Sequence, residues 1–244
     1  LKWLNLYKVI NLSPMSIGTW LLTVTIGVSV VYAYTYVHNA PGLPDDRRYA
    51  LRRALSWAAV PLGVATAVYT GILLGAMPSR PFWNSPILAL LFLVSSLSTG
   101  VAVILLARAL IHRKDADSGA ERHFEKSGYI LTASDTLLIG FEIMVIFLFL
   151  MFGYLTVGDV KEAVQVVLAG GSLATLFWLG FVVIGLVVPV LVELYYVMPK
   201  LLYHREYVAP RGVEIVVSVV VLFGGFLLRY IVVIAGQITG PVGV

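Results

Sequence analysis

Two carboxylates stand inside a long apolar stretch of this chain, where ionisable side chains are costly. Asp135 and Glu142 both lie in the apolar run 129–155 and are seven residues apart. On a helix this spacing places them nearly on one face, about 10 Å apart along the axis. A charged carboxylate at the centre of a membrane costs about 2.5–3.5 kcal/mol or more, so its presence indicates function. We interpret the pair as part of a proton route; the alternative is a pair of hydrogen bonds between helices.

One arginine lies at comparable depth in the last apolar run. Arg229 is the only Lys or Arg deep inside a predicted span, and it could serve proton transfer or act as a structural counter-ion. Counting residues from the same membrane face places Arg229 and Glu142 at similar depths. The sequence therefore predicts a direct Glu142–Arg229 ion pair, with Asp135 too far away to join it. Glu193 lies near the end of the fifth predicted span, where we expect an interfacial side chain.

Four side chains of different chemistry come together between two apolar runs. Tyr69 lies near the end of one run, and Arg80, Trp83 and Asn84 follow in the short loop before the next. A phenol, a positive charge, an indole and an amide are thus gathered at one membrane face, where they could bind a polar headgroup. The alternatives are an interhelical hydrogen bond for Tyr69 and a lipid-facing aromatic anchor for Trp83.

Composition assigns the chain to the membrane proteins. Only 12% of its 244 residues are charged, against about a quarter in soluble domains, and the mean hydropathy is +0.93. The basic residues lie in short loops rather than on one face, so we expect no nucleic-acid binding. There is no cysteine to hold an iron–sulfur cluster, and no metal-ligand cluster or paired mid-span histidine to hold a metal or a haem. The four histidines stand at span ends or in loops (His38, His112, His123 and His204).

The apolar runs predict an all-α, polytopic bundle with six transmembrane spans. The runs are too long and too uniformly apolar for barrel strands. Each is about 20 residues or longer, which is enough to cross a bilayer core of about 30 Å. The predicted spans are approximately 15–38, 55–77, 87–111, 129–155, 164–197 and 213–237. The fifth is too long for one straight crossing, and Pro189 within it predicts a kink because proline cannot donate to the carbonyl four residues earlier.

The distribution of basic residues predicts the orientation. Loops on the cytoplasmic side of a membrane carry an excess of Lys and Arg. One face carries twelve basic residues (Arg47, Arg48, Arg52, Arg53, Arg108, Arg113, Lys114, Arg122, Lys126, Lys200, Arg205 and Arg211) and the other carries four (Lys2, Lys8, Arg80 and Lys161). We therefore expect the first face to be cytoplasmic. Both termini of this chain and the Arg80–Asn84 loop would then face outward.

Four motifs in order resemble one family of membrane subunits. They are Asn-Leu-Ser-Pro-Met-Ser-Ile-Gly-Thr-Trp at 11–20, the stretch from Tyr69-Thr-Gly to Arg-Pro-Phe-Trp-Asn84, Asp135 with Glu142, and the ending from Gly224 to Gln237 that contains Arg229. Together they resemble the NrfD-type family, the membrane subunits of polysulfide reductase and similar oxidoreductases. The resemblance extends over nearly the whole sequence, here taken as a single membrane domain over 1–244.

The resemblance implies a fold, a cofactor and partners. The fold would have eight helices in two four-helix bundles; two helices that precede the Ser-Pro-Met motif in the family are missing here, so we expect this sequence to be a fragment. A quinone, menaquinone or ubiquinone, would bind near the outer face, with Tyr69 at its headgroup. An iron–sulfur subunit would dock there and exchange electrons with a molybdopterin or haem catalytic subunit.

The buried charges and the resemblance support one function, with two alternatives. We expect a multi-pass subunit of a prokaryotic cytoplasmic membrane that exchanges electrons between quinol and an extracytoplasmic iron–sulfur protein, and that is not catalytic alone. The quinone-binding candidates are Ser13, Tyr69, Arg80, Trp83 and Asn84, and the proton-transfer candidates are Asp135, Glu142 and Arg229. The alternatives are an ion-coupled secondary transporter, for which matched broken helices are not visible, and a purely structural membrane anchor.

Overall fold

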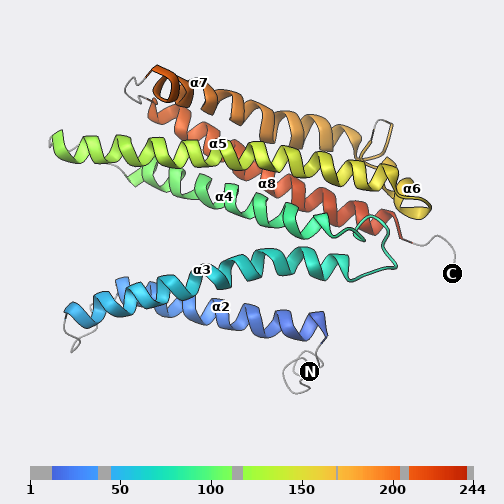
Figure 1. The fold of residues 1–244 in the computed structure, drawn as a ribbon, viewed down its shortest axis with the longest axis horizontal. Helices are drawn as coiled ribbons and strands as arrows, with labels where there is room; N and C mark the ends of the chain where they lie inside the picture. Colours follow the sequence, from blue (N-terminus) through green and yellow to red (C-terminus); the bar gives the residue numbers. More distant parts are fainter. Residues whose placement is uncertain (1–12, 38–44, 112–117, 169, 204–208, 241–244) are drawn as a thin grey trace. The chain divides into compact units, whose positions relative to one another are not determined.

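The computed structural model is built of helices that form two compact units, residues Leu1–Ala76 and Met77–Val244 (Figure 1). It describes residues 13–37, 45–111, 118–168, 170–203 and 209–240. Within these ranges six helices are long and apolar enough to cross a membrane, and no strand is present. The predicted fold class and the number of spans are thus confirmed. The grouping of all spans into one membrane domain stays a prediction.

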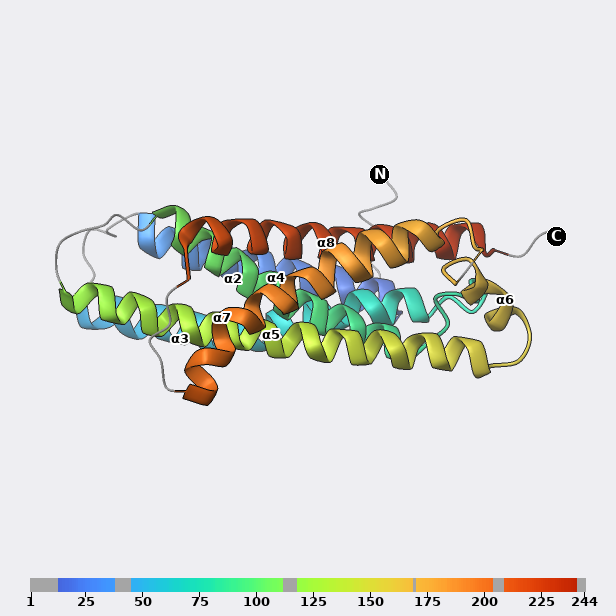
Figure 2. The same cartoon turned by 90° about the horizontal axis from the view of Figure 1, so that it is seen from above.

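The first unit is an antiparallel pair of long helices, α2 (Pro14–Val37) and α3 (Asp45–Gly75), which lie side by side in both ribbon views (Figures 1 and 2). Helix α2 begins at Pro14, and the Ser13 hydroxyl accepts a hydrogen bond from the Ser16 N–H at 3.3 Å, as expected of an N-cap serine followed by proline. Across the pair, the Thr25 and Thr66 hydroxyls are 3.2 Å apart. Such interhelical hydrogen bonds hold helices together where the hydrophobic effect is weak.

The second unit packs four long helical segments around one apolar core (Figures 1 and 2). They are α4 (Ile87–Ile111), α5 (Ser118–Leu155), the continuous pair of η2 (Leu176–Val187) and α7 (Val188–Tyr203), and α8 (Arg211–Ile238), with the short α6 (Asp159–Gln165) following α5. Leu88, Ile139, Phe181 and Leu228 are fully buried, one from each of the four segments. This core holds the polar side chains considered below in fixed positions.

The proline in the fifth span acts on the helix that precedes it. Pro189 has no N–H for the carbonyl of Gly185, and the backbone is π-helical from Leu176 to Val187, directly before it. The wider turn of a π-helix changes which residues face the bundle. Gly185 meets Gly224 of α8 so closely that a Cβ added to Gly224 would lie 2.8 Å from the Gly185 Cα. The sequence predicts a kink at Pro189; the structure shows a change of helix type before it, at a place where two backbones lie close together.

The observed span limits differ from the predicted ones mainly at the fifth span. That span begins at Leu176 rather than at Val164, because 159–165 form the separate helix α6 and Gly170 has a φ of 90°, which ends the helical path. Helices α3 and α5 start earlier than their predicted spans because polar first turns extend them. Residues 1–12, His38, His112 and His204 lie outside the described residues.

Candidate functional site

A pair of carboxyl groups lies in the interior of the second unit. Asp135 of α5 is 0% exposed and Glu193 of α7 is 3% exposed, and their side chains interact. The Ser98 hydroxyl donates to Asp135 Oδ1 at 2.8 Å, and the Thr136 hydroxyl donates to Glu193 Oε2 at 3.0 Å. A hydrogen bond between two carboxyl groups requires a proton on one of them. The pair can therefore hold and pass on a proton.

Glu193 was missed as a site residue at the level of sequence. The predicted fifth span ended at 197, which placed Glu193 near its end and indicated an interfacial side chain. That interpretation is wrong, because α7 continues to Tyr203 and Glu193 is buried within the span. The signal that could have found it is the apolar spacing of Leu-Leu-Tyr after Lys200, which prolongs the helix.

The second buried group joins Glu142 to Arg229 through a serine. Glu142 of α5 is buried, and its carboxyl interacts with the Ser95 hydroxyl of α4. Arg229 Nη1 lies 3.5 Å from the same Ser95 Oγ and donates to the Gly225 carbonyl at 2.7 Å, while Nη2 donates to Ser96 Oγ at 3.0 Å. Ser95 therefore stands between the acid and the base.

The predicted direct ion pair between Glu142 and Arg229 is wrong. Within the described residues no nitrogen of Arg229 lies within 4.0 Å of a Glu142 oxygen, although the two charges still attract each other. Counting residues gives the depth of each side chain in the membrane, but it does not give the direction in which the side chain points around the helix axis. Ser95 of α4, which interacts with both side chains, lies between them.

The loop that follows α3 is fastened to the last turns of α8. Trp83 Nε1 donates to the Val232 carbonyl at 2.7 Å, and Arg80 Nη1 donates to the Gly236 and Gln237 carbonyls at 3.3 and 2.9 Å. These carbonyls belong to the C-terminal end of a helix, where a positive charge is favourable. Trp83 is only 7% exposed, which excludes a lipid-facing anchor for it, whereas Asn84 is exposed.

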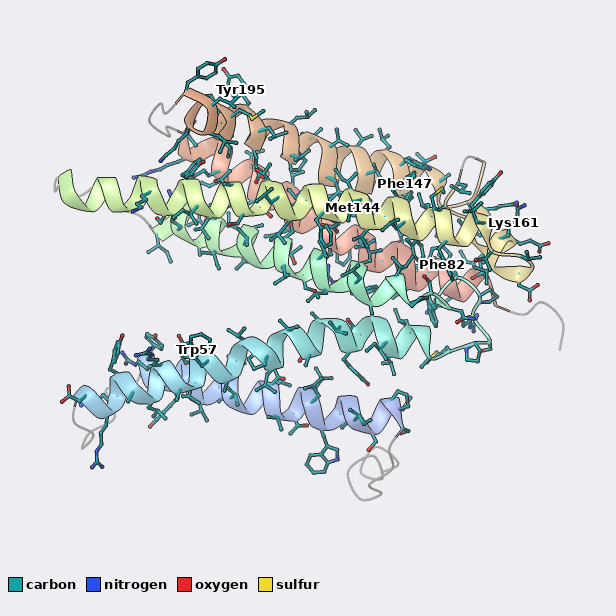
Figure 3. The ribbon with its side chains drawn as sticks, viewed as in Figure 1. Trp57, Phe82, Met144, Phe147, Lys161 and Tyr195 are labelled. Atoms are coloured by element: carbon teal, nitrogen blue, oxygen red, sulfur yellow. The ribbon has the colours of Figure 1, made fainter. Side chains whose placement is uncertain are left out.

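Aromatic side chains seal the same end of the second unit and mark its outer surface. Phe82, labelled in Figure 3, is buried and packs edge-on against Phe149 with 5.5 Å between ring centroids. Met144, Phe147 and Tyr195, also labelled there, are exposed on the outside of α5 and α7. Large exposed apolar side chains on a span suit contact with lipid. The polar groups described above thus lie behind an apolar exterior.

In the first unit, Tyr69 and Ser13 lie at the same end of the helix pair. The Tyr69 ring rests on Gly18 of α2, where any Cβ would overlap the phenol. Gly18 follows Ser13 by five residues, or about 7.5 Å along the helix. No described residue of the first unit forms a hydrogen bond with the Tyr69 hydroxyl, so the interhelical hydrogen bond that was the alternative does not form within the α2–α3 pair.

The candidate residues therefore fall into three groups. Asp135, Glu142 and Arg229 lie inside the second unit, and Glu193 joins them. Arg80 and Trp83 hold the loop against α8, and Tyr69 with Ser13 belongs to the first unit. Among the described residues no group of His, Asp or Glu side chains could hold a metal ion. The arrangement is suited to proton transfer along the second unit.

Comparison with known proteins gives the family. The family model described as "Polysulphide reductase, NrfD" matches residues 2–241. The sequence is 34% identical to one of the polysulfide reductase subunits of Wolinella succinogenes over 78% of this protein and 55% of that one. It is 32% identical to protein NrfD of Escherichia coli over 78% and 54%, respectively, and 30% identical to the NrfD homolog of Haemophilus influenzae over 73% and 51%. The sequence spans about half the length of these curated relatives. With a match over nearly all its residues, this multi-pass membrane protein belongs to the NrfD polysulphide reductase family.

Proposed function

We propose that the protein is the membrane subunit of an oxidoreductase complex, in which it exchanges electrons between membrane quinol or quinone and an extracytoplasmic iron–sulfur subunit, with associated proton transfer. The observation that carries the quinone part is the Tyr69 phenol. Its ring lies against Gly18, while its hydroxyl bonds to no described residue of the first unit. A fixed, unused phenol can donate a hydrogen bond to a quinone carbonyl oxygen.

The other candidates are assigned to the headgroup by the chemistry of their side chains. Ser13 lies at the start of α2, whose N-terminal end carries a partial positive charge that favours a reduced quinone oxygen. Arg80 and Trp83 use their donors on α8, so in this proposal they shape the loop rather than bind the headgroup directly. The exposed Asn84 amide is the group of that loop that remains available for a ligand.

Protons would move through the buried acids of the second unit. Quinol oxidation releases two protons together with two electrons, and the reverse reaction takes them up. Asp135, Glu193 and Glu142 are buried carboxyl groups from two packed helices, and Arg229 lies beyond Ser95. Hydroxyl groups of Ser98, Thr136 and Ser95 contact these acids and can orient a transferred proton.

The electron partner is proposed on grounds of chemistry and of the relatives' names. This sequence has no cysteine with which to bind an iron–sulfur cluster. The name of the Wolinella relative describes it as one polypeptide of a larger enzyme, polysulfide reductase. We therefore place the cluster on a separate subunit, and a molybdopterin or haem catalytic subunit beyond it. In this proposal the complex lies in the cytoplasmic membrane of a prokaryote, with the Arg80–Asn84 loop and both ends of this chain facing outward.

The test is removal of one oxygen atom. Tyr69→Phe keeps the ring on Gly18 and removes only the hydroxyl. Quinol-dependent turnover of the full complex in proteoliposomes should fall at least tenfold, which corresponds to about 1.4 kcal/mol. The matched control is Tyr49→Phe on the same helix, because the exposed Tyr49 is outside the proposed site. Wild-type turnover in Tyr69→Phe, with a normal yield of complex, would contradict the proposed role of the phenol.

A further inference from the structure

A small cavity lies near one end of the second unit, between α4, α5, α7 and α8. Its volume is about 20 Å³, and the polar groups that line it include Thr132, Glu193, Glu214 and Ser218. Glu193 belongs to the buried pair with Asp135. Glu214 lies in the first turn of α8. The cavity therefore separates the acid pair from a third acid closer to the end of the bundle.

Two buried polar atoms of residues that line this cavity have unused hydrogen-bonding capacity. Ser218 is 1% exposed, and its hydroxyl makes no hydrogen bond with the residues that the structure describes. Other serines and threonines of these helices donate to the carbonyl four residues earlier, as Ser96 does to Phe92 at 2.7 Å. Glu193 Oε2 accepts from Thr136, whereas Oε1 accepts from no hydroxyl or N–H group within the described residues, so beyond the bond that joins the Glu193 and Asp135 carboxyls it keeps a lone pair for a further donor. A buried polar atom left unbonded costs about 1–3 kcal/mol.

One water molecule would satisfy both atoms. A water molecule needs roughly 10–15 Å³ of accessible space and two to four polar partners, and this cavity has about 20 Å³. The Ser218 hydroxyl and Glu193 Oε1 supply two partners, and Thr132 and Glu214 line the same space. A bare metal cation would require more oxygen ligands, six or more in the case of Ca²⁺ or Mg²⁺. The size of the cavity and the number of its groups therefore favour water.

We propose that this cavity is a structural water site that connects Glu214 with the Glu193–Asp135 pair. The water donates to Glu193 Oε1 and exchanges a hydrogen bond with Ser218. Proton transfer then needs no large movement of the helices: a proton passes from Glu214 to the water while the water gives another of its protons to Glu193, so that charge and atoms balance. The role of this water in proton uptake rests on the function proposed above, whereas the existence of the water site does not.

The position of Glu214 indicates the outer end of this connection. Arg108 of α4 lies 3.6 Å from Glu214, Nη2 to Oε1, and a Cβ at Gly128 of α5 would overlap the Arg108 guanidinium. Arg108 and Glu214 thus form a charged group near the helix ends that carry most of the basic residues. In the proposed orientation this end faces the cytoplasm, so Glu214 is the residue through which protons reach the cavity.

Deuterium exchange of the buried carboxyl groups tests the water site without requiring quinone turnover. The full complex is transferred from H₂O to D₂O, and the shift of the protonated-carboxyl C=O band is followed by time-resolved infrared spectroscopy. Loss of the band in Glu193→Gln assigns it to the acid pair. Ser218→Val fills the cavity and should slow the exchange at least tenfold. Ser218→Ala removes one hydrogen-bond partner of the water and should slow the exchange less.

A serine elsewhere in the same bundle provides the matched control. Ser134 of α5 is half-buried, does not line the cavity, and bonds to the Ile130 carbonyl of its own helix at 2.7 Å. Ser134→Val should exchange at the wild-type rate. Wild-type exchange rates in both Ser218→Val and Ser218→Ala would overturn the water site, even in a complex with full quinol turnover. If exchange is slowed in the Ser218 variants but the wild-type complex shows no quinol turnover, the water site is supported and the proposed function is contradicted.

Discussion

The contact between Gly185 and Gly224 predicts a large effect from the addition of a single methyl group. In Gly224→Ala the new Cβ would lie 2.8 Å from the Gly185 Cα and 2.9 Å from its carbonyl oxygen. Carbon atoms in good contact are roughly 3.5–4.0 Å apart. Because both neighbouring atoms belong to the backbone, rotation of a side chain does not relieve the overlap, and η2 and α8 must separate by roughly 0.7–1.2 Å.

The energetic cost follows from this separation. A gap of roughly 0.5–1 Å forfeits a quarter to a half of each dispersion contact along the interface, and overpacking of a well-packed core costs about 1–3 kcal/mol. Alanine also favours a helix over glycine by up to about 1 kcal/mol, so the comparison needs a control with the same gain. Gly140→Ala provides it, because Gly140 of α5 has nothing within 4 Å of its added Cβ.

The assay is thermal unfolding of the purified complex in detergent, followed by tryptophan fluorescence. One kcal/mol shifts Tm by about 2–4 °C for a protein of 150–250 residues. We therefore expect Gly224→Ala to melt roughly 2–12 °C below Gly140→Ala. Gly185→Ala should behave like Gly224→Ala, because its Cβ would lie 2.7 Å from the Gly224 Cα. Equal melting temperatures for all three variants would refute the close packing of these helices.

Three further predictions concern protons, topology and the loop. The Asp135→Asn variant should assemble normally, and its quinol-dependent turnover should fall at least tenfold, about 1.4 kcal/mol. The Glu142→Gln variant should also assemble, because it loses no direct ion pair. Failure of either variant to assemble would contradict this prediction. An impermeant thiol reagent should label Ser79→Cys only from outside and Lys126→Cys only from the cytoplasm; the reverse inverts the topology. Trp83→Phe should lower Tm because the buried indole hydrogen bond to the Val232 carbonyl is lost, at about 0.5–1.5 kcal/mol; an unchanged Tm argues against that hydrogen bond.

The buried acids in the middle of an apolar run could be predicted from the sequence, whereas Glu193 could not, because its span was predicted to end too early. Asp135 and Glu142 are visible because a carboxylate among some twenty apolar residues has no solvent to face. Glu193 was obscured by a span limit placed six residues before the end of α7. Span limits are difficult to place because polar residues such as Lys200 can extend their charge to the interface while the helix continues.

Partners across the bundle were the least predictable feature. Depth can be counted along one helix, and it matched Glu142 with Arg229 in height. Their separation by Ser95 depends on the rotation of α4, α5 and α8 about their axes, which packing fixes and residue counting does not. The hydrogen bond of Trp83 to a backbone carbonyl carries no sequence signature, since every residue supplies the same acceptor.

The ties between the Arg80–Trp83 loop and α8 have a consequence for biosynthesis. They join residues 149 to 157 positions apart in the sequence. At about 5–20 residues per second, a ribosome takes roughly 7–30 s to make the intervening segment. During that time the Trp83 indole and the Arg80 guanidinium have already been made but lack their acceptors, so this end of the bundle stays open. Insertion of α8 is therefore the step that closes it, and a nascent polypeptide stalled before Val232 would expose to quality control a loop that cannot be fastened.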